Sequence, residues 1–86
     1  ISVIGQAFPK EFSTMIQLGL QGKNTAAFEL HYALMDIVAL IFEENNPAGI
    51  KAVLEELSIC SNAVRLPLVA SSSELQSKIA KFVTNF

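Results

Sequence analysis

The sequence predicts an all-α protein of four helices, preceded by a short N-terminal strand. Apolar residues recur at spacings of three and four along most of the chain, which is typical of helices that bury one face. Proline, asparagine, glycine and serine stand between these stretches, at the places where helices begin and end. The chain has 86 residues, which is room for a single domain.

The chain opens with a predicted strand and a first helix. The β-branched residues of Ile1–Ile4 are typical of a strand, and we expect Gly5 to end it. Pro9 suits the first position of a helix, and Gly22 is expected to terminate that helix. Its apolar face consists of Phe12, Met15, Ile16 and Leu20.

The second helix is the longest predicted element. It runs from Asn24, as an N-terminal cap, to about Phe42. Because apolar residues occupy most of its circumference, we expect it to be buried on several sides, with Leu34 and Ile37 at the centre.

A third helix begins near Asn46 and Pro47, with Asn46 as the cap and Pro47 in the first turn. Lys51 and Glu55 can pair on its outer face, four residues apart. Gly49 is expected to weaken its first turn by up to about 1 kcal/mol relative to alanine. The inner face consists of Ile50, Val53, Leu54 and Leu57.

A packed loop is expected over Ser58–Ala70, where Pro67 favours extended backbone before it. The last helix then follows a capping box, in which Ser71 is the cap and Glu74 reaches back, although Ser72 serves nearly as well. The buried face of this helix consists of Leu75, Ile79, Phe82, Val83 and Phe86.

Charge and hydrophobicity restrict the possible partners. The net charge is −2, and no basic cluster is denser than Lys78 and Lys81, so no nucleic-acid partner is expected. Hydrophobic residues make up 51% of the chain and charged residues only 16%. This is too little charge to cover so small a domain, so we expect part of the apolar surface to meet a partner or a missing part of the chain.

The compartment is predicted from what the sequence lacks. The longest apolar run, Ile37–Phe42, is too short to cross a membrane, and no signal peptide precedes it. Cys60 is the only cysteine, which fits a reducing cytoplasm or says nothing about the compartment, and it is expected to be a small core hydrophobe. Because the chain opens on isoleucine rather than methionine, we expect it to be cut from something longer.

None of the residues with reactive side chains forms a recognisable reaction centre. His31 has no second ligand at metal-binding spacing and is expected to be structural or at the surface. Tyr32 is expected to bond through its hydroxyl. Glu43 and Glu44 point about 100° apart on a helix and are expected to form a solvated helix end, not a catalytic pair. Cys60 lacks a neighbouring base to activate it.

Arg65 must place its guanidinium either in solvent or on acceptors, and a structural clamp onto helix C-terminal carbonyls or a nearby carboxylate is favoured over solvation. The serines at 71–73 lack a partnered base and suit helix capping. The lysines all fall on polar faces or element ends, which does not suit a Schiff-base nucleophile: Lys10, Lys23, Lys51, Lys78 and Lys81. The sequence therefore assigns no catalytic, cofactor-binding or metal-binding residue and no cofactor.

Five short motifs occur in order: Ile1-Ser2-Val3, Pro9-Lys10-Glu11, Leu30-His31-Tyr32, Asn46-Pro47 followed by Lys51, and Arg65-Leu66-Pro67-Leu68. This order resembles the C-terminal end of the dihydrodipicolinate synthase family, over essentially the whole chain. The resemblance implies that residues 1–22 are the end of strand eight and helix eight of a (β/α)8 TIM barrel. Residues 23–86 would then form a three-helix C-terminal appendage.

The chain departs from the family pattern at two places. Ile4-Gly5-Gln6 stands where the family commonly has a turn like Thr-Ala-Asn, and Gly49 stands where it has a second proline. The same segment of another pyruvate-dependent lyase or aldolase therefore stays an alternative.

The resemblance also implies a function for the parent enzyme. That enzyme would be an oligomeric, cytoplasmic lyase of lysine biosynthesis by the diaminopimelate pathway. It would condense pyruvate, held as a Schiff base on a lysine, with aspartate semialdehyde. The family's reactive lysine, proton relay, substrate-binding arginine and feedback site all lie on earlier segments, so we expect this segment alone to be inactive.

The expected partners are the remainder of the barrel and, for the isolated segment, further copies of itself. From a different class of protein, the alternative is an independent helical module that uses its apolar faces to bind a protein partner.

Overall fold

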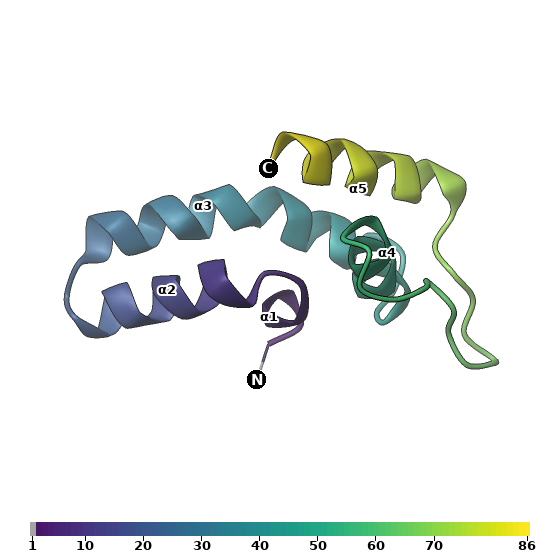
Figure 1. The fold of residues 1–86 in the computed structure, drawn as a ribbon, viewed down its shortest axis with the longest axis horizontal. Coiled ribbons are helices and arrows are strands. Elements are labelled where there is room, and N and C mark those ends of the chain that lie inside the picture. Colours follow the sequence, from purple (N-terminus) through teal and green to yellow (C-terminus); the bar gives the residue numbers. More distant parts are fainter. Residues whose placement is uncertain (1) are drawn as a thin grey trace. The chain divides into compact units, whose positions relative to one another are not determined.

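The computed structural model describes residues 2–86, and every regular element within them is a helix (Figure 1). The helices are α1 (Ile4–Ala7), α2 (Pro9–Leu20), α3 (Asn24–Ile41), α4 (Ala48–Glu56) and α5 (Ser73–Asn85). The predicted all-α class is confirmed. The chain divides within α3 into two compact units, Ile1–Asp36 and Ile37–Phe86. The division at residues 22 and 23 that the family resemblance implies stays a prediction.

The predicted N-terminal strand is replaced by the short helix α1. Val3 has helical backbone angles, Ile4 begins α1, and Gly5 lies inside the helix. The strand prediction is therefore wrong at residues 2–4, and Ile1 lies outside the described residues. β-branched residues favour a strand only where another strand pairs with it, and residues 2–86 contain no strand.

Helix α2 begins and ends as the sequence predicts. Pro9 is its first residue, and Gly22 follows its end with φ +78°. The Gly22 N–H donates to the Gly19 carbonyl at 3.1 Å, and the Lys23 N–H donates to the Leu18 carbonyl at 2.9 Å. This pair of bonds is a Schellman motif, in which glycine adopts the left-handed conformation at little cost.

Helix α3 confirms the long second helix, although its start differs by one position. Asn24 is its first residue and not the cap, because the Lys23 carbonyl already accepts from the Ala27 N–H at 3.1 Å. Leu34 and Ile37 are buried, as predicted.

Helix α4 begins one residue later than predicted, because Pro47 occupies the cap position and Ala48 is the first helical residue. Within the second unit, Gly49 lies directly against the end of α3. A Cβ atom at this position would be 1.9 Å from the Ile41 carbonyl oxygen. The expectation that alanine at position 49 would make the first turn of α4 more stable is therefore wrong, since an alanine side chain does not fit between α4 and the end of α3.

The end of α4 is a second Schellman motif without glycine. The Ser58 N–H donates to the Glu55 carbonyl and the Ile59 N–H to the Leu54 carbonyl, both at 2.9 Å, and Ser58 has φ +61°. No helix or strand lies in residues 59–72. Helix α5 then packs against α4. The core of this unit consists of Ile37, Ile41, Ala48, Ile50, Ala52, Val53, Leu54, Leu75 and Ile79.

Candidate functional site

The aromatic candidates on α3 lie at the surface. The His31 and Tyr32 rings are 5.4 Å apart between centroids, and Tyr32 is 6.4 Å from Phe28. The surface position predicted for His31 is confirmed. The bonded hydroxyl predicted for Tyr32 is wrong, since Tyr32 is exposed and its hydroxyl has no partner within residues 2–86.

The segment between α4 and α5 is more exposed than predicted. Cys60 is exposed, so the expectation that it is a buried hydrophobe is wrong. Leu66 and Val69 are also exposed, which contradicts a packed loop. Short-range turns hold this segment at the surface, such as the one closed by the Leu68 N–H and the Arg65 carbonyl at 2.9 Å.

Arg65 and Lys51 lack the partners that the sequence predicts. The Arg65 side chain is exposed and bonds to no carbonyl or carboxylate of residues 2–86, so the predicted clamp is wrong for this chain. Lys51 makes no ion pair with Glu55 in the described residues, and the Glu55 carboxylate accepts from the Asn62 backbone N–H at 3.2 Å.

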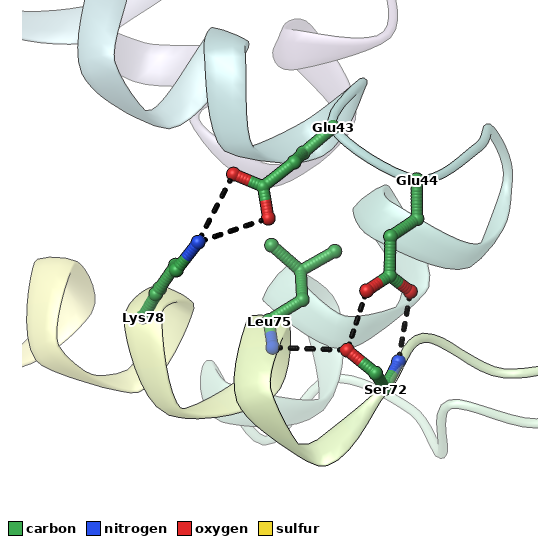
Figure 2. Close-up of polar contacts among 5 residues, drawn as sticks. All are labelled: Glu43, Glu44, Ser72, Leu75 and Lys78. Carbon is green, nitrogen blue, oxygen red and sulfur yellow. Dashed lines mark hydrogen bonds and ion pairs between the residues drawn. The ribbon is translucent and has the colours of Figure 1, made fainter.

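Four residues of the second unit join the end of α3 to the start of α5 (Figure 2). We call Glu43, Glu44, Ser72 and Lys78 the α5 clasp. Glu44 accepts from the Ser72 N–H at 2.8 Å and from the Ser72 hydroxyl, whose oxygen accepts from the Leu75 N–H at 3.2 Å. Glu43 pairs with the Lys78 ammonium at 3.1 Å. The two glutamates thus bind different partners and do not converge on one point.

The clasp rearranges the predicted capping box. Ser72, not Ser71, is the cap of α5. Position three of the helix is then Leu75, so the prediction that Glu74 reaches back is wrong. Glu44 accepts from the cap residue's N–H in its place, and it comes from 28 residues earlier in the chain. Local spacing gives no signal for such a partner.

Electrostatics in the clasp centre on Glu44. The hydroxyl and the backbone N–H of Ser72 hold the pKa of this carboxylate below its ordinary value of 4.5, and the Lys78 charge acts in the same direction. The Glu43–Lys78 pair is solvent-exposed on both sides, so it contributes under about 1 kcal/mol to stability. The clasp is therefore a structural device.

The described surface includes a hollow in each unit. A hollow of about 220 Å³ in the first unit is lined by Met15, Ala27, Phe28 and His31. A hollow of about 320 Å³ in the second unit, here called the basic groove, is lined by Pro47, Lys51, Ala63, Val64, Arg65 and Leu68. The basic groove is the one of the two that carries charged side chains with no partner.

Metal and membrane sites were sought in the same part of the chain. Residues 2–86 contain no group of three or more histidine, cysteine, aspartate or glutamate side chains placed to hold a metal ion. None of the helices described is both long enough and apolar enough to cross a bilayer.

Comparison with known proteins gives the family. The model of the Dihydrodipicolinate synthetase family matches residues 1–86. The chain therefore belongs to this family, as the order of its motifs predicts.

Relatives from distant organisms carry one enzyme name. The chain is 48% identical over 82 residues to a 4-hydroxy-tetrahydrodipicolinate synthase of Flavobacterium psychrophilum, covering 95% of this chain and 28% of that protein. It is 35% identical over 85 residues to the synthase of that name from Methanococcus maripaludis, covering 99% of this chain and 29% of that protein. The chain thus spans little more than a quarter of the length of these relatives.

A solved structure shares the helical arrangement. A crystal structure of dihydrodipicolinate synthase (DapA) matches with a TM-score of 0.91 and 32% sequence identity. The match covers 99% of this chain and 30% of that chain. The fold described here is therefore that of a segment within a dihydrodipicolinate synthase.

Proposed function

We propose that this chain is a structural helical part of a lyase that condenses pyruvate with aspartate semialdehyde. In this proposal, pyruvate is held as a Schiff base on a lysine outside these 86 residues, and the segment alone is inactive. The observation that carries it is the match of 99% of the chain to less than a third of a dihydrodipicolinate synthase, at a TM-score of 0.91.

The environments of the lysines support a structural role. A lysine becomes a nucleophile when burial or a neighbouring cation favours its neutral amine. Lys51 is half-buried and the other four lysines are exposed. Lys78 instead pairs with Glu43 at 3.1 Å. These surroundings suit solvated cations and do not suit a Schiff-base residue.

The proposal also assigns a place to the segment. The stretch 1–22 would supply helix eight of the barrel, and residues 23–86 would pack outside it. Exposed apolar residues of α2 support this arrangement, because helix eight of a barrel covers the sheet. The partner of the segment is then the rest of the barrel, in the cytoplasm.

A chimaeric enzyme tests this function. The matched segment of the Flavobacterium psychrophilum synthase is replaced by this chain, and condensation of pyruvate with aspartate semialdehyde is measured. We expect the chimaera to fold and to retain activity, while the same enzyme without the segment loses it. A folded but inactive chimaera would contradict the proposal. An enzyme that works equally well without the segment would favour the independent interaction module.

A further inference from the structure

We propose that the basic groove binds a small organic acid that carries one carboxylate and a short apolar body. The groove joins the start of α4 to the segment around residues 63–68, and its charged lining residues are Lys51 and Arg65. This site lies wholly within the second unit and does not depend on the function proposed above.

Charge is the first argument for a carboxylate. The two charged residues of the groove are both cations, although the chain as a whole has a net charge of −2. Glu55, four residues after Lys51, is the nearest acid in sequence, but it makes no ion pair with Lys51 and instead accepts from the Asn62 N–H at 3.2 Å. Neither Lys51 nor Arg65 has an anionic partner within residues 2–86, so an added anion gains two charge-assisted contacts.

Size and lining are the second argument. The volume of about 320 Å³ lies at the small end of ligand pockets, which run from about 300 to 1,000 Å³. Apart from the two cations, the walls are apolar: Pro47, Ala63, Val64 and Leu68. A bare inorganic ion would leave these walls without contact, whereas an apolar body attached to the carboxylate covers them.

Helix α4 also favours an anion in the groove, by a smaller amount than the two cationic side chains. Its cap residue, Pro47, lines the groove and makes no side-chain cap hydrogen bond. The start of α4, with the positive end of its helix dipole, therefore lies at the edge of the groove and favours a negative charge there.

Benzoate is the probe that tests the proposal, and benzamide is its neutral counterpart of the same shape. Each is titrated into the 86-residue chain while backbone amide resonances are followed by NMR. We expect benzoate to saturate, with the largest shifts at Lys51, Arg65 and Leu68, and benzamide not to saturate. Binding should weaken as ionic strength rises, because salt screens exposed charges.

Charge-removing variants then locate the site. Lys51→Met and Arg65→Met remove the charge and keep an unbranched apolar side chain, and each should weaken benzoate binding by about tenfold. Lys81→Met removes an exposed lysine of α5 outside the groove and should leave binding unchanged. Far-ultraviolet circular dichroism verifies that the variants remain folded.

Three results would overturn the proposal. One is equal binding of benzoate and benzamide, and another is unchanged benzoate binding in both groove variants. The third is a set of benzoate-induced shifts that leaves Lys51, Arg65 and Leu68 unmoved, which would place the binding outside the groove.

Discussion

Glu44 shows how a single exposed carboxylate fixes the start of a helix. It accepts two hydrogen bonds from Ser72, the cap of α5, although the two residues are 28 positions apart in the chain. Both bonds favour the ionised carboxylate, which is why the pKa of Glu44 is lowered. The clasp thus makes the start of α5 sensitive to acid.

The stability of the chain should fall in acid partly because of Glu44. Since its pKa is lower in the folded state than the ordinary 4.5, its ionised form contributes stability above that value. This contribution is lost as the pH falls through the lowered folded pKa. Urea unfolding between about pH 6 and pH 3 should therefore show a steeper loss for the natural chain than for Glu44→Gln. Glu56→Gln, at an exposed position outside the clasp, serves as the control and should lose stability in acid as steeply as the natural chain. Identical stability profiles for the natural chain and Glu44→Gln would contradict the role of Glu44.

Replacing each of three adjacent serines by alanine should change the unfolding free energy by different amounts. Ser72→Ala removes the cap and its bonds to Glu44, and should cost about 1 kcal/mol of unfolding free energy. Ser73→Ala changes an exposed side chain and should stay within about 0.5 kcal/mol. Ser71→Ala removes a buried hydroxyl that has no hydrogen-bond partner, and should not destabilise. Equal costs at all three positions, measured by urea unfolding, would refute the assignment of the cap.

At the scale of the helices, the sequence predicts elements that depend on neighbours in the chain. Pro9 and Gly22 delimit α2 correctly because their backbone preferences act locally. Apolar spacing locates α3 and its buried centre for the same reason. β-branched residues predict a strand at Ile4, but Ile4 lies in a helix, since a strand needs a partner that residues 2–86 do not contain.

The site was less predictable than the helices. The role of Glu44 depends on Ser72, and no local pattern joins residues so far apart. Helical spacing predicts a pair between Lys51 and Glu55, but the Glu55 carboxylate bonds to a backbone N–H of the following loop and makes no ion pair with Lys51. Loop contacts of this kind have no periodicity from which they could be predicted.

Replacement by alanine should change the unfolding free energy in opposite directions at two glycines, Gly49 and Gly19. Gly49→Ala would place a Cβ atom 1.9 Å from the Ile41 carbonyl oxygen, so the end of α3 and the start of α4 must separate. We expect a loss of more than about 1 kcal/mol of unfolding free energy. Gly19→Ala lies inside α2 with nothing within 4 Å of the new atom, and should add about 0.5 to 1 kcal/mol. Thermal and urea unfolding of both variants measure the two changes in unfolding free energy. A stabilised Gly49→Ala would contradict the close approach of Gly49 to the end of α3.

For the molecule as a whole, the notable feature is the apolar surface that the chain leaves open. Helix α2 contains no buried residue, and Leu20 on it is 84% exposed. Phe28, Tyr32 and Met35 are exposed on α3. So much exposed apolar surface is unusual for a monomeric protein and is typical of a face that another surface covers.

The isolated chain should therefore self-associate. Sedimentation equilibrium at tens of micromolar is expected to show species larger than the 9.3 kDa monomer. Replacing Leu20 and Phe28 together by lysine should shift the equilibrium towards the monomer. Leu66→Lys, at a loop position that is 89% exposed, should leave it unchanged. A monomer at all concentrations, with its helical signal intact, would contradict this prediction.

Borohydride trapping of pyruvate tests most directly the claim that this chain is a structural part of a lyase without a reactive lysine of its own. The isolated 86-residue chain and the active chimaera are each incubated with pyruvate, reduced with borohydride, digested and analysed by mass spectrometry. We predict one stoichiometric adduct in the chimaera, on a lysine outside these 86 residues, and none in the isolated chain. A stoichiometric adduct on Lys10, Lys23, Lys51, Lys78 or Lys81 in either protein would contradict the account.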